Sequence, residues 1–158
     1  MNQHQILLSL LETCKLHAQR LHTALHHLGP FLPMTPQQLS TLKDEEIAYF
    51  ELLTSRFAKL QDTLGSKVFP CLLKCLMEDV EGSTLPDMLA RLEKLNLISS
   101  MNFWVELRTI RNFVSHEYPG DVALTVHHLN QIHQASLRLL EYWQFLLDRM
   151  KTLTFPAF

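Results

Sequence analysis

The chain has 158 residues, of which 47% are hydrophobic and 19% are charged, and its formal net charge is −2 with the histidines neutral. This length suits one domain over residues 1–158 with a single core, and a mean hydropathy of +0.01 argues against both a disordered chain and a membrane protein. The charge balance disfavours a broadly basic nucleic-acid-binding protein, although a local basic groove remains compatible with it.

The first predicted element is a long amphipathic helix over about residues 2–28. Its apolar residues recur at helical spacing, and Gly29-Pro30 ends it. Residues 29–42 hold three of the seven prolines and form a connecting segment. A second helix begins near Asp44, where acidic residues suit a helix N-terminus.

That second helix carries an apolar stripe as far as Leu64. Gly65-Ser66 and Pro70 predict a bend, after which the helix resumes through Val80. The next break is "EGSTLPD", in which Ser83 or Thr84 can cap a short helix that runs through Leu95.

Two further helices complete the chain. One runs from Ser100 to about His116 and ends before Pro119-Gly120, and the last runs from about Val122 to Met150. The alternation of polar and apolar residues that is typical of strands is not found. The sequence therefore predicts an all-α fold, an up-and-down bundle of four to five helices.

The chain offers little for a metal ion or a cofactor. His22 and His26 stand one turn apart, but no third ligand and no H-E-x-x-H pattern accompany them. Cys71 and Cys75 lack a partner pair at zinc-finger spacing and are interpreted as small core residues of a reducing compartment. No nucleotide-binding glycine loop or serine-hydrolase motif occurs. We therefore expect neither metal nor cofactor.

The N-terminal residues lack the basic region of a signal peptide, and no run approaches the roughly 18 apolar residues of a membrane-spanning helix. We therefore expect a cytoplasmic protein that does not bind a membrane.

The segment "RTIRNFVSHEYPG", residues 108–120, concentrates the polar groups of the chain. If the helix continues to His116, then Arg108, Arg111, Asn112 and Ser115 fall in one broad sector. Asn112 and His116 would lie one turn apart, so that a hydrogen bond between them would orient the imidazole.

An arginine beside a histidine suits the cleavage of a phosphodiester. Arginine binds phosphate oxygens in a bidentate manner, and histidine gives or takes a proton. RNA carries its own nucleophile, the 2′-hydroxyl, so such a site needs no metal. One arginine and one histidine make a small active site, which a symmetric dimer would complete with a second copy. The alternative is a purely structural helix end, where Arg111 pairs with a carboxylate and His116 caps carbonyl groups.

The pattern Arg111-Asn112-x-x-x-His116-x-Tyr118 resembles the R-x4-H-x-Y signature of HEPN-domain proteins of the HepT type. The preceding "LPDMLARLEKLNLIS" and the order of helices resemble that family as well. The N-terminal part is longer than in its most compact members. A similar helix end occurs in the nucleotidyltransferase substrate-binding proteins, which are HEPN relatives without an established nuclease activity.

The resemblance implies a HEPN-like toxin that forms a homodimer and cleaves RNA without metal in a cleft at the dimer interface. Arg111 would bind the phosphate and His116 would be the acid and base, with support from Asn112. Arg108 and Ser115 are further candidate phosphate contacts. The implied partner is a minimal nucleotidyltransferase antitoxin, which would block the ribonuclease by adding AMP to Tyr118. The alternative is a non-catalytic substrate-binding subunit of such a nucleotidyltransferase.

Overall fold

The structure is a computed structural model that describes residues 1–114, residue 116 and residues 119–155. Its helices are α1 (Gln3–Leu28), α2 (Pro36–Leu39), α3 (Asp44–Thr63), α4 (Phe69–Cys75), α5 (Leu85–Lys94), α6 (Met101–Phe113) and α7 (Val122–Lys151). A 3₁₀ turn, Gly29–Phe31, follows α1, and a π-helical segment, Leu64–Val68, joins α3 to α4. These described residues contain no strand, so the predicted all-α class is confirmed.

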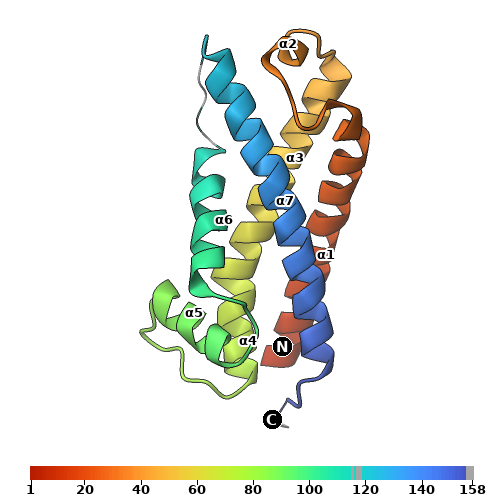
Figure 1. The fold of residues 1–158 in the computed structure, drawn as a ribbon. Coiled ribbons are helices and arrows are strands. Elements are labelled where there is room, and N and C mark those ends of the chain that lie inside the picture. Colours follow the sequence, from red (N-terminus) through yellow and green to blue (C-terminus); the bar gives the residue numbers. More distant parts are fainter. Residues whose placement is uncertain (115, 117–118, 156–158) are drawn as a thin grey trace.

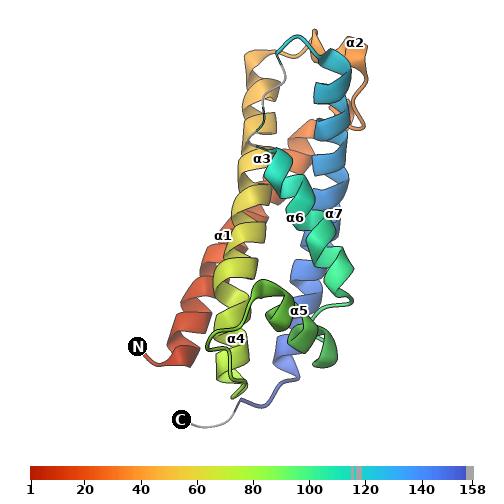
Figure 2. The ribbon, with the colours of Figure 1, turned by 90° about the vertical axis from the view of Figure 1, so that its left-hand side faces the viewer.

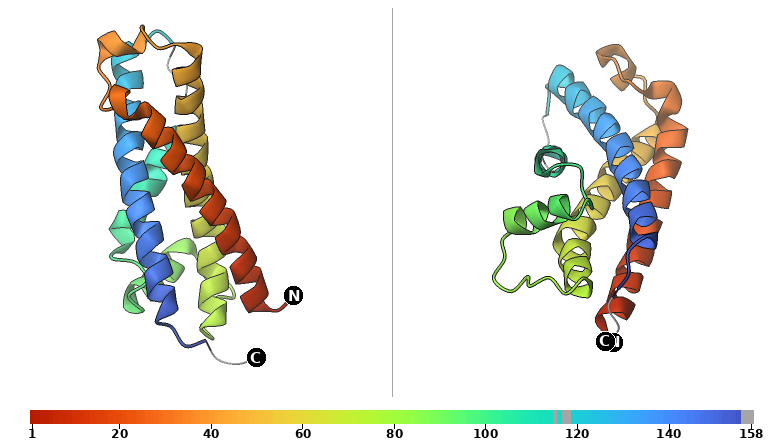
Figure 3. Two further views of the ribbon diagram at one scale, coloured as in Figure 1. Left: turned by 90° about the vertical axis from the view of Figure 1, so that its right-hand side faces the viewer. Right: turned by 60° about the horizontal axis from the view of Figure 1, so that its bottom comes forward.

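Consecutive long helices run in opposite directions, which makes the arrangement an up-and-down bundle (Figure 1). Helix α1 crosses obliquely over α3 and α7, whereas α5 lies across one end of the bundle against α4 and α6 (Figure 3). The described residues form about six helices when α3 and α4 are counted as one, rather than the predicted four to five. The addition is α2, one turn within the connecting segment that the sequence patterns left without structure.

Side-chain caps define several helix starts, and the cap at Thr84 is one of the two that the sequence predicted for α5. Asn2 accepts a hydrogen bond from the backbone N–H of Gln5 at the start of α1, and Thr84 accepts one from Asp87 at the start of α5. Ser100 caps α6, and Asp121 caps α7. A cap satisfies backbone donors that the first helical turn leaves unpaired, so these boundaries are encoded locally.

The helix is not interrupted at the bend predicted after Leu64. Helical hydrogen bonding continues through the π-helical segment, and α3 and α4 form one continuous rod (Figure 2). Pro70 lies in the first turn of α4, directly after the π-helical segment, where the wider helical turn accommodates a residue without an N–H donor. Gly65 packs against the indole of Trp104, where a Cβ atom would come within 3.2 Å of the ring. The glycine therefore serves a close packing contact and not a turn.

The rod ends earlier than predicted, at Cys75 instead of Val80. Met77 adopts a left-handed φ of 62°, and the N–H of Glu78 donates to the carbonyl of Leu73 at 3.0 Å. This is a Schellman ending, which usually uses glycine at the left-handed position. Because methionine gives no sequence signal for such a stop, the apolar periodicity overran the true end.

The connecting segment after α1 is tied to the last helix by one side chain. The Asn130 Oδ1 accepts a hydrogen bond from the Met34 N–H at 2.7 Å, and the Asn130 Nδ2 donates to the Met34 carbonyl at 2.9 Å. Both backbone groups of Met34, a buried residue, are thus satisfied by a residue on α7.

Aromatic side chains fill the core where α4, α6 and α7 meet. The fully buried rings of Phe69 and Trp104 have centroids 4.7 Å apart, and Tyr142 packs 5.8 Å from Trp104. The Tyr142 hydroxyl donates to the Leu97 carbonyl at 2.9 Å. Cys14, Cys71 and Cys75 are also buried, and burial raises the pKa of Cys75 to about 11, in keeping with their interpretation as core residues.

None of the described helices is both long and apolar enough to cross a lipid bilayer.

A buried histidine couples stability to pH. The Arg56 Nη1 on α3 donates to the His17 Nδ1 on α1 at 3.0 Å, and His17 is 9% exposed. Burial, with the nearby positive charges of Arg56 and Lys59, lowers the pKa of His17 below its ordinary value of 6.5.

Because the unfolded chain binds this proton more readily, the contribution of His17 to stability is complete above about pH 6.5 and is lost as the pH falls from there through the lowered folded pKa. We expect the free energy of unfolding in urea to fall between pH 7.5 and pH 5.5, and to fall less in His17→Gln. The half-buried His133, whose pKa is also lowered, stays in both proteins and accounts for a decrease that the two proteins share. Equal decreases in the two proteins would contradict this assignment.

Candidate functional site

The polar segment 108–120 begins on α6 but leaves the helix earlier than predicted. Helix α6 ends at Phe113. Beyond it the backbone forms turns that are tighter than an α-helix: the Val114 N–H donates to the Arg111 carbonyl at 3.1 Å, and the His116 N–H donates to the Phe113 carbonyl at 3.0 Å. Asn112 is exposed in the last turn of α6, and because the helix ends at Phe113, His116 does not lie one helical turn after Asn112 as predicted. Ser115 and Tyr118 lie outside the described residues.

Arg111 forms a two-pronged ion pair with Asp62 of α3. Its Nε donates to Asp62 Oδ1 at 2.8 Å and its Nη2 donates to Oδ2 at 2.6 Å. The side chains are 33% and 46% exposed, so the pair lies at the surface of the bundle. The hydrogen bonds and charge of Asp62 raise the pKa of Arg111.

A guanidinium has five N–H groups, so this pairing leaves three of them for another acceptor. The structural interpretation of the helix end foresaw a carboxylate partner for Arg111, but no local pattern identified Asp62, which lies 49 residues away in the sequence.

Arg108 lies near the same carboxylate. It is exposed, and it lines a cavity of about 250 Å³ together with Asp62 and Trp104. Both arginines of α6 are therefore directed toward the Asp62 region of α3, which places two positive charges around one negative charge.

His116 lies on a different cavity, at the end of α6. This cavity has a volume of about 350 Å³ and is lined by Thr54, Phe113, Val114, His116, Pro119, Thr125, His128, Leu129 and Ile132. The Phe113 ring stacks on His128 at 5.2 Å between centroids and lies 6.4 Å from His116. Two histidines thus line one largely apolar cavity, and both are neighbours of the same phenylalanine.

The sequence patterns did not single out His128, which directly follows His127. A usable signal was present: the short Pro-Gly connection brings the first turns of α7 beside the last turn of α6. His128 Nδ1 lies 3.2 Å from the Gln131 Oε1 on the same helix.

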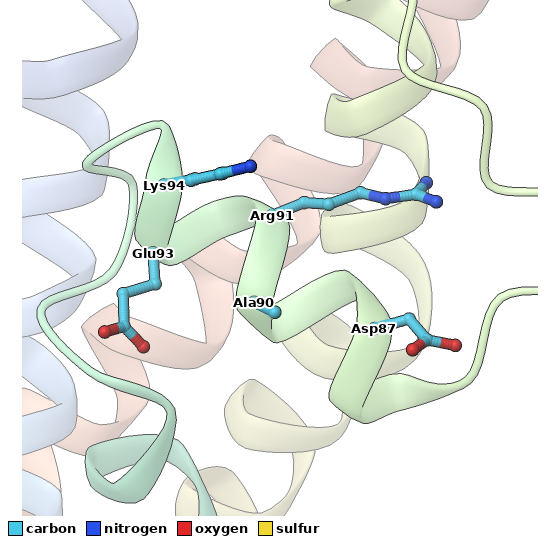
Figure 4. A pocket seen from close by; sticks show the side chains of 5 residues that line it. All are labelled: Asp87, Ala90, Arg91, Glu93 and Lys94. Atoms are coloured by element: carbon cyan, nitrogen blue, oxygen red, sulfur yellow. The ribbon is translucent and has the colours of Figure 1, made fainter.

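A third cavity, of about 620 Å³, lies along α5 and is shown in Figure 4. Its lining residues are Asp87, Ala90, Arg91, Glu93 and Lys94, with Arg91 and Lys94 extended toward the same side of the helix. Carboxylates and cations alternate along this one helix, which gives the cavity no preference for a ligand of either charge.

The described residues contain no group of three or more histidine, cysteine, aspartate or glutamate side chains placed to hold a metal ion. His22 and His26 are both exposed on α1.

Comparisons of the chain with protein-family models, with curated proteins and with solved structures found no match.

Proposed function

We propose that this chain is a HepT-like ribonuclease, a HEPN toxin that cleaves RNA in the cytoplasm without a metal ion. The observation that carries the proposal is the pair of histidines, His116 and His128, on one cavity at the end of the helix that bears Arg111. The motif spacing supplies the reason to connect these groups with RNA, and the pair supplies the two proton-transfer groups that cleavage requires.

In the proposed reaction, the 2′-oxygen of a ribose attacks the adjacent phosphorus and the bond from phosphorus to the 5′-oxygen breaks. One histidine, neutral at the start, takes the proton of the 2′-hydroxyl. The other, protonated at the start, gives a proton to the leaving 5′-oxygen. The products are a 2′,3′-cyclic phosphate and a free 5′-hydroxyl. The N–H groups of Arg111 that Asp62 leaves unused bind the non-bridging oxygens.

The defining experiment incubates partner-free, unmodified protein with single-stranded RNA in EDTA. Accumulation of fragments that end in a 2′,3′-cyclic phosphate supports the proposal. Intact RNA at micromolar enzyme concentration, over hours, rejects it.

The family resemblance also implies a homodimer with the active cleft between its subunits. Mixing Arg111→Ala with His116→Ala subunits tests this arrangement, because mixed dimers restore one complete site if the two residues act across the interface. Restored cleavage supports a shared site. No recovery, with mixed dimers shown to form, places the two groups in the same subunit. A monomer in sedimentation at micromolar concentration rejects the dimer.

We further propose a minimal nucleotidyltransferase as the antitoxin, with Tyr118 as the residue that receives AMP. A bulky anion two residues from His116 would obstruct the site and repel RNA phosphates. Intact mass after co-expression with a nucleotidyltransferase encoded nearby provides the test. An AMP-sized increment that disappears in Tyr118→Phe supports the modification, and no increment rejects it.

A second function is favoured by the ion pair between Arg111 and Asp62. An arginine already held by a carboxylate suits a structural role, and hence a non-catalytic subunit that presents substrate to a nucleotidyltransferase. This alternative predicts a stable complex with the transferase, no RNA cleavage and no growth arrest when the chain is expressed alone.

Asp62→Asn distinguishes the two roles of Arg111. The variant keeps an acceptor for the guanidinium but removes the negative charge, so a phosphate bound to Arg111 should bind more tightly, on the order of fivefold at low salt. RNA affinity measured by fluorescence anisotropy gives the readout. The matched control is Glu106→Gln, which removes the carboxylate that pairs with Arg138 of α7; Glu106 lies on α6, the helix that also bears Arg111. An equal change in both variants, or none in Asp62→Asn, would contradict phosphate binding by Arg111.

A further inference from the structure

A buried hydrogen-bond donor lies beside the cavity that Arg108 lines. This cavity, here called the Trp104 cavity, lies between α3, the π-helical segment, α5 and α6, and its volume is about 250 Å³. Its lining residues are Gln61, Asp62, Gly65, Ser66, Leu85, Met88, Trp104 and Arg108. π-Helical segments occur often at functional sites, because the extra residue redirects nearby groups.

The indole N–H of Trp104 has no hydrogen-bond acceptor among the residues that the structure describes, and Trp104 is 0% exposed. Its edge faces Gly65, since a Cβ atom there would lie 3.3 Å from Nε1 and 3.2 Å from Cζ2. Leaving a buried donor without an acceptor costs free energy, and such groups are few in folded proteins. A ligand that supplies an acceptor would satisfy the indole N–H at the place where Gly65 contributes no side chain.

The other walls carry both donors and acceptors. Gln61 presents a buried amide, being 3% exposed, and Asp62 presents a carboxylate. Arg108 is exposed and forms no ion pair within the described part of the chain, so its guanidinium is available at the cavity mouth. Leu85 and Met88 add apolar surface from α5. The Asp62 carboxylate on the wall disfavours binding of a small anion, and the apolar side formed by Leu85 and Met88 favours a flat, uncharged ligand.

We propose that the Trp104 cavity receives one unstacked base of single-stranded RNA. The edge of a base carries both acceptors and donors, which suit the indole N–H, the Gln61 amide and the Asp62 carboxylate, and its face can stack on the Arg108 guanidinium. The inference rests on the proposed function, because Asp62 both pairs with Arg111 and lines the Trp104 cavity. A phosphate on Arg111 and a base in the Trp104 cavity would lie on either side of that one carboxylate.

Binding can be measured without cleavage. The chain has two tryptophans, so Trp143→Phe leaves Trp104 as the only one to emit. Titration of this protein with adenosine, guanosine, cytidine and uridine should change the Trp104 emission saturably for at least one nucleoside. Ribose, which has no base, should leave it unchanged. If no nucleoside changes the Trp104 emission more than ribose does, the inference is overturned.

Two variants locate the binding. Gly65→Ala places a methyl group against the indole and should weaken nucleoside binding by about fivefold or more. Gly29→Ala is its control, since a Cβ there meets no described atom within 4 Å. Arg108→Ala changes an exposed residue, so it should fold and should weaken binding similarly, which keeps the test decisive if Gly65→Ala is unstable. Unchanged affinity in Arg108→Ala, or in a folded Gly65→Ala, overturns the inference.

The outcomes separate this inference from the proposed function. Nucleosides that bind the Trp104 cavity of a protein without nuclease activity support the cavity and reject the ribonuclease. If the protein cleaves RNA but no nucleoside changes its Trp104 emission, the ribonuclease is supported and base binding in the Trp104 cavity is overturned.

Discussion

Replacement of His116 by alanine is expected to slow RNA cleavage by a factor of about 10² to 10⁴, the usual contribution of a positioned acid or base. The cavity that His116 lines contains one further histidine, His128, and the proposed reaction needs a proton acceptor and a proton donor at once. Without His116 only one of them remains. Single-turnover rates with end-labelled RNA in EDTA measure the loss directly, because product release does not enter them.

The neighbouring His127 provides a matched control for this experiment. It is exposed on α7, adjacent in sequence to His128, and is not among the residues that line the cavity. His128→Ala should reduce the rate by a similar factor to His116→Ala, whereas His127→Ala should leave the rate within about twofold. A His116→Ala protein that cuts RNA as fast as the unmodified chain would remove the basis for the proposed function. Loss of activity in all three variants alike would instead indicate a change in the fold of α7.

Phe69→Ala is expected to have the largest effect on stability, a decrease of about 3 to 5 kcal/mol in the free energy of unfolding. Phe69 is fully buried at the start of α4, and its ring contacts Trp104 and Tyr142, which belong to α6 and α7. Truncation would therefore leave a cavity among three helices that cannot close by moving one of them. The free energy of unfolding from urea titrations, with an unchanged m-value, provides the measurement.

Phe145→Ala is the control for this change, since the same substitution is made at a residue that is 41% exposed on α7. Its cost should stay below about 1 kcal/mol. Similar costs at the two positions would mean that the aromatic cluster does not hold α4, α6 and α7 together.

Sequence patterns predicted those parts of the fold that depend on neighbouring residues. The starts of α5, α6 and α7 follow from the capping residues Thr84, Ser100 and Asp121, whose side chains act within their own first turn. The end of α1 at Leu28 was found through Gly29 for the same reason. Apolar periodicity then identified the buried faces of the long helices.

The errors arose where distant contacts decide the backbone. Gly65 and Pro70 looked like the signals of a bend, but the space beside Trp104 and the wider π-helical turn keep the rod continuous. The early end of α4 depends on a methionine in the left-handed region, at Met77, which no rule based on glycine would find.

The candidate site likewise divides into residues that a local pattern identifies and residues that depend on distant contacts. The motif identified Arg111 and His116, whereas Asp62 and His128 come from α3 and α7 and became visible only with the packing of these helices against α6. Ser115 and Tyr118, which lie outside the described residues, remain predictions.

The π-helical segment Leu64–Val68 also constrains how this chain can change over generations. A turn of this kind holds one residue more than a regular helix needs, so losing one residue there would restore a regular helix, whereas losing one residue within α3 itself would rotate α4 by about 100° relative to the start of the rod. Phe69, Leu72 and Leu73, all fully buried, would then turn away from the core, although no apolar residue had been removed. A deletion within α3 is therefore more damaging than most substitutions, and lineages of this protein should lose a residue from this rod only at the π-helical segment.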